Sequence, residues 1–155
     1  MTEQTIPDVT KTKSLAVPVY QELPSRIAVV GSGNFGRAIV TKVRSAGFDV
    51  IWGSRNPTGD QIPVEKVMME RILILAVPSF SWSSLPLSSL QPGCVVLDPS
   101  NRRARCEPGL ASQAETLQTL LPPGVTTVKC LNTVSAYELE NQSLDAGKQV
   151  IIRKH

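Results

Sequence analysis

Histidine is almost absent from this sequence, because the only one, His155, is the last residue. Chain ends are rarely held in place, so we expect neither metal ligation nor general-base catalysis from this side chain. Cysteines are also scarce, and Cys94, Cys106 and Cys130 form no C-x-x-C pair. This spacing argues against a zinc site and against a disulfide framework. It favours reduced thiols in an intracellular protein.

Long apolar runs are missing as well. No stretch reaches the roughly 18 apolar residues that a membrane-spanning helix requires, and residues 1–21 lack the apolar centre of a signal peptide. The net charge is only +3 and aromatic residues make up 5% of the chain, so a nucleic-acid-binding surface is not indicated. We expect a soluble cytoplasmic chain whose mild positive charge suits a phosphate-bearing ligand.

The chain has 155 residues, 41% of them hydrophobic, which suffices for one sizeable core and predicts a single domain. Residues 1–24 contain three prolines and show no hydrophobic periodicity. We therefore expect a flexible leader over residues 1–24 and one domain over residues 25–155.

Beyond the leader, short apolar runs alternate with segments that can form helices. Such alternation predicts parallel strands joined by right-handed crossovers, a Rossmann-type doubly wound α/β sheet. The predicted strands are Ile27–Val30, Val50–Trp52, Ile72–Val77, Cys94–Leu97, Val125–Cys130 and Gln149–Ile152.

Helices are predicted between several of these runs. Apolar residues recur at helical spacing from Phe35 onward, and Gly47 stands where a helix would end. Another helix is predicted over residues 111–121, stopped by two prolines and a glycine. Only residues 56–71 separate the second and third runs, so we expect the usual third strand and its helix to be shortened or missing, with one short helix around Val64–Glu70.

A glycine-rich segment, Gly31-Ser32-Gly33-Asn34-Phe35-Gly36, directly follows the first predicted strand and opens a predicted helix. This is the G-x-G-x-x-G pattern of dinucleotide-binding folds. Gly31 permits a tight turn, Gly33 lets a pyrophosphate approach the backbone, and Gly36 lets helix and strand pack closely. The free N–H groups at the start of the helix then face the phosphates.

The end of the second predicted strand indicates which dinucleotide binds. An NAD-binding protein places Asp or Glu there, whereas this chain has Gly53-Ser54-Arg55-Asn56. A carboxylate would repel a 2′-phosphate, while Ser54 can donate a hydrogen bond to it and Arg55 can clamp it. The alternative for Arg55 is a solvated loop arginine. Its register with the glycine pattern favours NADP(H) over NAD.

Three further segments follow predicted strands and reach the same edge of the sheet. In Val77–Ser84, at the topological switch point, Phe80 and Trp82 either line a nicotinamide or flavin pocket or pack the next helix against the sheet. Asn101 either contacts the cofactor or builds a turn. Asn132 either reaches the nicotinamide, caps the next helix, or does both.

Taken together, these blocks resemble the cytosolic oxidoreductase domain of the STEAP (six-transmembrane epithelial antigen of prostate) metalloreductases, itself similar to archaeal deazaflavin:NADP oxidoreductases. The resemblance runs from about Ser25 to Val150. It rests on the order and spacing of these pieces: Gly31–Phe35, Gly53–Pro57, Asp98–Asn101, Ser112–Leu117, Lys129–Tyr137 and Gln149–Val150.

The resemblance implies a domain that binds NADPH and reduces a flavin, FAD, from which the family passes electrons through a membrane haem to ferric or cupric ions. It implies a place on the cytosolic side of the endosomal or plasma membrane. From the truncation and an exposed edge strand we expect further copies or full-length membrane relatives as partners. The cofactor-binding residues expected from the motifs and the resemblance together are Gly31, Ser32, Gly33, Asn34, Phe35, Gly36, Ser54, Arg55, Val77, Pro78, Ser79, Phe80, Ser81, Trp82, Ser83, Ser84, Asn101, Ala136, Tyr137 and Asp145.

The chain departs from the family in three places. Val77–Ser84 lacks the family's Arg-Glu-His-Tyr block, and the stretch after Pro57 is shorter by nearly a helix and a strand. Residues 151–155 stand where the family continues toward its membrane domain. We therefore expect an NADP-binding domain truncated before the membrane part.

Two functions follow as hypotheses. The first is an oxidoreductase module in which hydride passes from NADPH to a flavin, the protein supplying position and electrostatics without an acid–base dyad. The second is a non-catalytic NADP-binding or partner-binding regulatory protein, for which the truncation and an exposed edge strand are the arguments. A soluble carbonyl or imine reductase shares the fold but requires a substrate domain after the sheet.

Overall fold

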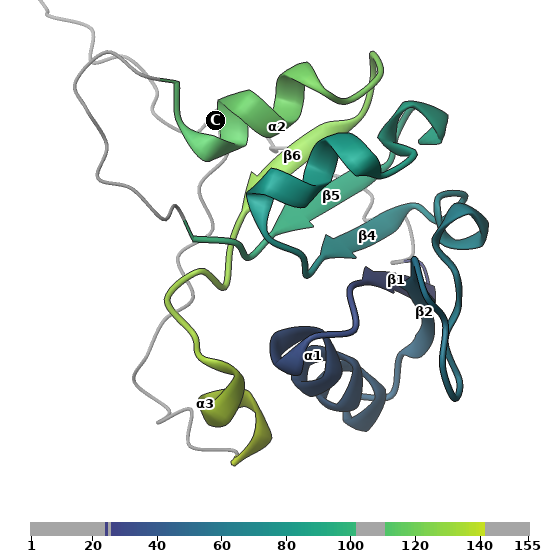
Figure 1. The fold of residues 1–155 in the computed structure, drawn as a ribbon, viewed down its shortest axis with the longest axis vertical. Coiled ribbons are helices and arrows are strands. Elements are labelled where there is room, and N and C mark those ends of the chain that lie inside the picture. Colours follow the sequence, from purple (N-terminus) through teal and green to yellow (C-terminus); the bar gives the residue numbers. More distant parts are fainter. Residues whose placement is uncertain (1–23, 25, 102–110, 142–155) are drawn as a thin grey trace, which may run out of the picture.

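The computed structural model describes residues 24, 26–101 and 111–141. Six parallel strands form one sheet in the order β3-β2-β1-β4-β5-β6 (Figure 1). The strands are β1 (Arg26–Val30), β2 (Asp49–Ser54), β3 (Ile62–Pro63), β4 (Ile72–Leu75), β5 (Val95–Asp98) and β6 (Thr126–Lys129). The predicted strand Gln149–Ile152 and the predicted leader, apart from Pro24, lie outside the described residues.

The strand order reverses at β1. Strands β2 and β3 lie on one side of it, and β4, β5 and β6 lie on the other. In both pairings Val30 is in register with the neighbouring strand, opposite Gly53 of β2 and Leu75 of β4. This is the order of dinucleotide-binding sheets, so the predicted Rossmann-type fold is confirmed. Ligands bind in such sheets at the carboxyl ends of the strands where the order reverses, here beside β1 and β4.

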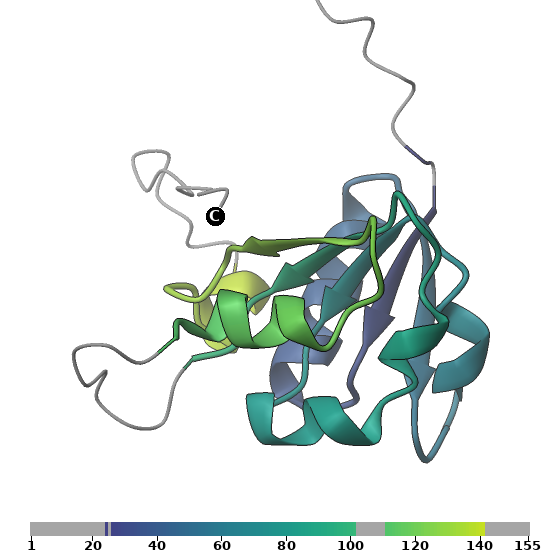
Figure 2. The ribbon, with the colours of Figure 1, turned by 90° about the horizontal axis from the view of Figure 1, so that it is seen from above.

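Helices cover both faces of the sheet (Figure 2). On one face α1 (Asn34–Ser45) packs against α3 (Ala136–Glu140). Their buried residues Ile39 and Leu139 share an apolar cluster with Val29 of β1. Burial of this face stabilises α3, which is too short to be stable as an isolated helix in water.

The opposite face is covered by α2 (Gln113–Thr119) and by three short 3-10 helices, η1 (Val64–Val67), η2 (Ser79–Ser84) and η3 (Leu87–Ser89). Leu117 of α2 and Trp82 of η2 are buried in the same apolar cluster as Leu75 of β4. Both faces of the sheet are therefore apolar, which explains why its strands appear in the sequence as continuous apolar runs rather than alternating ones.

Gly47 terminates α1, as predicted. Its φ is +89°, its N–H donates to the carbonyl of Arg44 at 3.0 Å, and the N–H of Phe48 donates to the carbonyl of Val43 at 3.3 Å. This is the Schellman arrangement, which requires a left-handed residue and so favours glycine. The chain turns directly from this cap into β2.

The connection from β2 to β4 is as short as predicted. β3 has only two residues, and the single turn η1 follows it. Val64, Val67 and Met68 are buried there against the sheet. Gly53 of β2 leaves room for Val67, since a Cβ on Gly53 would lie 2.6 Å from Cγ2 of Val67.

Two of the three cysteines, Cys94 and Cys130, lie within the described residues, and both are buried free thiols. Burial raises the pKa of each thiol to about 11, and the charge of Asp98 adds to the effect at Cys130. A thiol with this pKa is protonated at neutral pH and is a poor nucleophile. Cys106 lies outside the described residues.

Over residues 26–101 and 111–141, none of the helices has the length and apolar character needed to cross a membrane. The same part of the chain contains no group of three or more His, Cys, Asp or Glu side chains able to hold a metal ion.

We predict that Gly53→Ala destabilises the fold by roughly 1–3 kcal/mol, because the added methyl group overlaps the fully buried side chain of Val67. Val67→Ala removes the overlapping atoms, so the double variant should be more stable than the sum of the two single changes implies. Urea denaturation of all three variants measures this coupling. Additive losses would contradict direct packing of η1 on β2.

Candidate functional site

The glycine turn after β1 brings three pieces of backbone into contact. Gly31 has a φ of +123°, and a Cβ there would lie 2.2 Å from the carbonyl oxygen of Ala76, just after β4. A Cβ on Gly36 would lie 2.1 Å from the carbonyl oxygen of Gly31. Neither position has room for a side chain. The roles predicted for these two glycines, a tight turn and close packing of helix on strand, match this geometry.

Gly33 differs from its two neighbours in the pattern. It is the N-cap of α1, with an extended backbone, and a Cβ built on it would meet nothing within 4 Å. No acidic residue lies in the first turn of α1 and no side chain caps it. The first N–H groups of the helix therefore have neither a side-chain cap nor an acidic neighbour, an arrangement that suits an anion.

Trp52 of β2 supports the glycine turn, a role that no local sequence pattern predicted. Its indole Nε1 donates a buried hydrogen bond to the carbonyl oxygen of Gly31 at 2.8 Å, and the N–H of Gly31 donates to the carbonyl of Gly53 at 3.0 Å. Both polar backbone groups of Gly31 are thus bonded to the end of β2. The strand that carries Ser54 and Arg55 also holds the turn in place.

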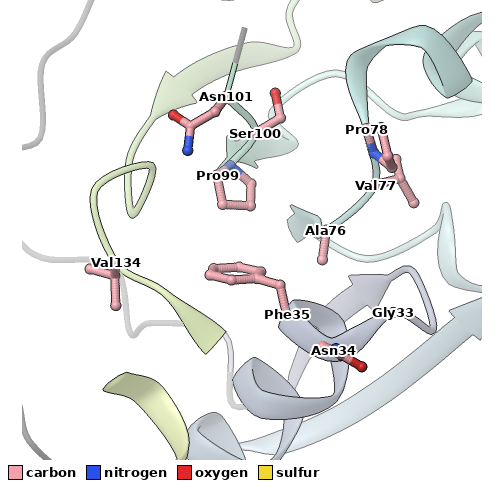
Figure 3. Close-up of a pocket in the computed structure, with 10 residues that line it drawn as sticks. All are labelled: Gly33, Asn34, Phe35, Ala76, Val77, Pro78, Pro99, Ser100, Asn101 and Val134. Carbon is pink, nitrogen blue, oxygen red and sulfur yellow. The ribbon is translucent and has the colours of Figure 1, made fainter. Parts of the chain in front are cut away.

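A cleft of about 410 Å³ opens beside the turn, over the carboxyl ends of β1, β4 and β5 (Figure 3). The ring of Phe35 points across it, toward the side where Pro99 and Val134 lie. Most of the lining is apolar. The lining residues are Gly33, Asn34, Phe35, Ala76, Val77, Pro78, Pro99, Ser100, Asn101 and Val134.

A smaller cleft of about 110 Å³ lies on the other side of the turn, at the end of β2. Val77 lines both clefts, so they adjoin along the same edge of the sheet. The residues lining the smaller cleft are Val30, Gly31, Ser32, Ser54, Arg55, Asn56, Val77 and Leu85. The predicted pair Ser54 and Arg55 therefore lies next to the glycine turn.

The two members of this pair differ in exposure. Ser54 is buried, and its Oγ accepts a hydrogen bond from the N–H of Asn56 at 3.2 Å, which leaves its hydroxyl hydrogen available. Arg55 is exposed, and its Nη1 donates to Oγ of Ser84 at 3.1 Å. The guanidinium is therefore bonded to a neutral partner.

The segment Val77–Ser84 meets the site with only some of its residues. Val77 and Pro78 line the larger cleft, and Ser84 contacts Arg55. Trp82 is 2% exposed within the core, so its core-packing alternative is the one that the structure supports. Phe80 is 65% exposed. The residues that line the two clefts do not include Phe80, Ser79, Ser81 or Ser83.

An ion pair with a fully buried carboxylate lies at the far wall of the larger cleft. Asp98 and Lys129 are in register at the ends of β5 and β6, 2.8 Å apart, with side chains 0% and 19% exposed. Asp98 accepts the N–H of Ser100 at 2.8 Å, and Lys129 donates to the carbonyl of Ser100. Gln113 accepts a further bond from Lys129 at 3.3 Å. Charged residues at the ends of two predicted strands were the available sequence signal, and no role was predicted from them.

Asn101 lines the larger cleft, and its side-chain amide donates to the carbonyl of Asn132 at 2.8 Å. The helix-capping alternative for Asn132 is wrong, because Ser135 caps α3 in a capping box with Glu138. Residues immediately before a helix compete for this role, and Ser135 has the required glutamate three residues later.

The two remaining predicted contacts within α3 lie away from the clefts. Ala136 packs against the apolar cluster beneath α1, and Tyr137 is 72% exposed. Neither is among the residues that line the two clefts. Asp145 lies outside the described residues.

No protein-family model matches the chain, but curated proteins do. The chain is 33% identical over 147 residues to metalloreductase STEAP3 of Rattus norvegicus, which covers 86% of this chain and 30% of the relative. It is 31% identical over 137 residues to metalloreductase STEAP2 of Homo sapiens, a match that covers 81% of this chain and 28% of that relative. The predicted resemblance is confirmed, and the chain spans about three tenths of the length of these relatives.

Solved structures share the fold. A putative F420-dependent NADP reductase from Arthrobacter sp. FB24 has a TM-score of 0.68 at 20% identity, over 83% of this chain and 73% of that one. A reductive aminase from Aspergillus terreus in complex with NADPH and ethyl levulinate has a TM-score of 0.55 at 18% identity, over 73% of this chain and 43% of that one. At these identities the likeness concerns the fold.

We predict that Lys129→Met lowers the free energy of unfolding by about 3–5 kcal/mol, because the buried carboxylate of Asp98 loses its counter-ion. The double variant D98N/K129M carries no buried charge, so it should regain part of that stability. Urea melts followed by tryptophan fluorescence compare the variants. If the double variant lost the full sum of both single changes, direct pairing of these side chains would be refuted.

Proposed function

We propose that this chain is an NADP(H)-binding oxidoreductase domain of the STEAP metalloreductase type. The observation that carries the proposal is the pair of adjoining clefts that flank the glycine turn, with Arg55 at the smaller and apolar side chains in the larger. Similarity in sequence to metalloreductases supports it, as does likeness in fold to an NADP reductase and to an NADPH-bound aminase.

The described residues fit the parts of an NADP(H) molecule. The pyrophosphate would lie against the first turn of α1, where Gly33 leaves space and no acidic side chain opposes an anion. The 2′-phosphate would lie at the smaller cleft, with a hydrogen bond from Ser54 and a charge-assisted one from Arg55. The nicotinamide would lie in the larger cleft, against Phe35 and beside Asn101.

When bound, NADPH supplies the chemistry, a hydride. Among the described residues that line the larger cleft, none is ionisable. The chain's own contribution is therefore to hold and orient the nicotinamide and to exclude water, with no proton transferred by a lining side chain. Such a site suits an acceptor that needs no side-chain acid.

We propose a flavin, FAD, as this acceptor, and ferric or cupric ions as the final electron acceptors in a complete metalloreductase. The resemblance implies a flavin position near Tyr137 and Asp145, and the exposed ring of Tyr137 at the start of α3 suits a stacking contact. The same proposal places the domain in the cytoplasm, with full-length membrane relatives or further copies of the chain as partners.

We expect NADPH to bind at least about tenfold more tightly than NADH, because only NADPH has a 2′-phosphate for Arg55. Arg55→Ala should weaken NADPH binding by roughly 10–100-fold and leave NADH binding unchanged. Tryptophan fluorescence reports both affinities, since Trp52 bonds to the glycine turn and Trp82 lies in η2.

The same preparations test catalysis. Incubation with FAD in the absence of oxygen should give flavin reduction that depends on NADPH. NADPH binding without flavin reduction would support the non-catalytic, regulatory function in its place. Equal affinity for NADPH and NADH in the wild type would overturn the assignment of NADP(H).

A separate prediction concerns Gly33. Gly33→Ala should cost at most about 1 kcal/mol of stability, because its backbone is extended and its Cβ has free space. The methyl group occupies the position of the pyrophosphate, so binding of NADPH and NADH should fall together by tenfold or more.

Gly31→Ala is the matched comparison, and it should destabilise the fold itself, since its Cβ overlaps the carbonyl of Ala76. Thermal melts and nucleotide titrations measure both effects. Full nucleotide affinity in a folded Gly33→Ala variant would rule out the proposed pyrophosphate position.

A further inference from the structure

The exposed guanidinium of Arg55 is held by a residue from another part of the chain. Nη1 of Arg55 donates to Oγ of Ser84 at 3.1 Å, across a separation of 29 residues. The hydroxyl of Ser84 donates its own hydrogen to the carbonyl of Ser81 at 2.8 Å. That hydroxyl has one hydrogen only, so it meets Arg55 as an acceptor.

Ser84 stands on a well-anchored segment. Trp82 and Leu85, on either side of it, are buried in the core, and the N–H of Leu85 donates to the carbonyl of Trp82 at 3.0 Å. Leu85 also lines the smaller cleft, beside Arg55. The acceptor oxygen is therefore fixed relative to the cleft proposed for the 2′-phosphate.

A neutral acceptor has a different effect from a carboxylate at this place. Within the described ranges, no Asp or Glu lies within ion-pair distance of Arg55, whose charge is left for a ligand. An arginine has five N–H donors, and a single bond to Ser84 leaves four for phosphate oxygens. Holding the long side chain in one position also reduces the conformational entropy that ligand binding would otherwise remove.

We infer that Ser84 is a positioning residue that sets the preference for the 2′-phosphate by holding Arg55 at the smaller cleft without neutralising it. The inference rests on the proposed function and assigns a specificity role to a residue outside both the glycine pattern and the Ser54-Arg55 pair. Ser84 acts through Arg55, so its effect depends on the presence of that side chain.

The test compares the affinities for NADPH and NADH in four variants by fluorescence titration. Ser84→Ala should weaken NADPH binding about three- to tenfold with no change for NADH, the effect of one hydrogen bond. Ser84→Thr keeps the hydroxyl and should restore the preference. Ser84→Asp should abolish it, because a carboxylate pairs with Arg55 and repels the phosphate. Ser88→Ala, an exposed serine of η3, is the control and should match the wild type.

A double variant separates a positioning role from a structural one. In the Arg55→Ala background, Ser84→Ala should have no further effect on NADPH affinity. An unchanged preference in Ser84→Ala, or an equal loss for both nucleotides, would overturn the inference while leaving the proposed function intact. A wild type without preference for NADPH would overturn the proposed function itself, whatever the Ser84 variants show.

Discussion

The contact of three backbone segments at Gly31 is the constraint on which the rest of the site depends. The carbonyl oxygens of Ala76 and Gly31 occupy the space that Cβ atoms at Gly31 and Gly36 would need, so β1, the end of β4 and α1 approach as closely as backbones allow. This approach directs the start of α1 toward the edge of the sheet. It also separates the two clefts, which lie on either side of the turn and adjoin at Val77.

Residues outside the glycine pattern keep this arrangement in place. Trp52 bonds to the turn from β2, so the strand that presents Arg55 and the turn proposed to meet a pyrophosphate are held as one unit. On the opposite wall of the larger cleft, Asp98 accepts a hydrogen bond from the N–H of Ser100, and its partner Lys129 donates one to the carbonyl of Ser100. A binding groove of this kind is preorganised, because little of its backbone has to be ordered when a ligand enters.

The short connection between β2 and β4 shows how one face of the sheet is covered there by a single turn of 3-10 helix. Its two-residue strand β3 lies at the outer edge of the sheet, away from the point where the strand order reverses. The single turn η1 covers β2 because Gly53 has no side chain, and Val67 takes that space in the core. The two clefts are lined by residues at the ends of β1, β2, β4 and β5, and by none of β3 or η1.

Local sequence patterns determined the fold class, most strand positions, the end of α1 at Gly47, and the position of the glycine turn beside Ser54 and Arg55. These features depend on residues close together in the chain, on apolar runs and on glycine conformations. Only the tertiary structure decided that Trp82 enters the core while Phe80 stays exposed, and that Lys129 pairs with Asp98 across 31 residues. It also decided that Ser84 meets Arg55. Burial and pairing of this kind arise between segments distant in sequence, whose proximity is set by the packing of the sheet and not by any local pattern.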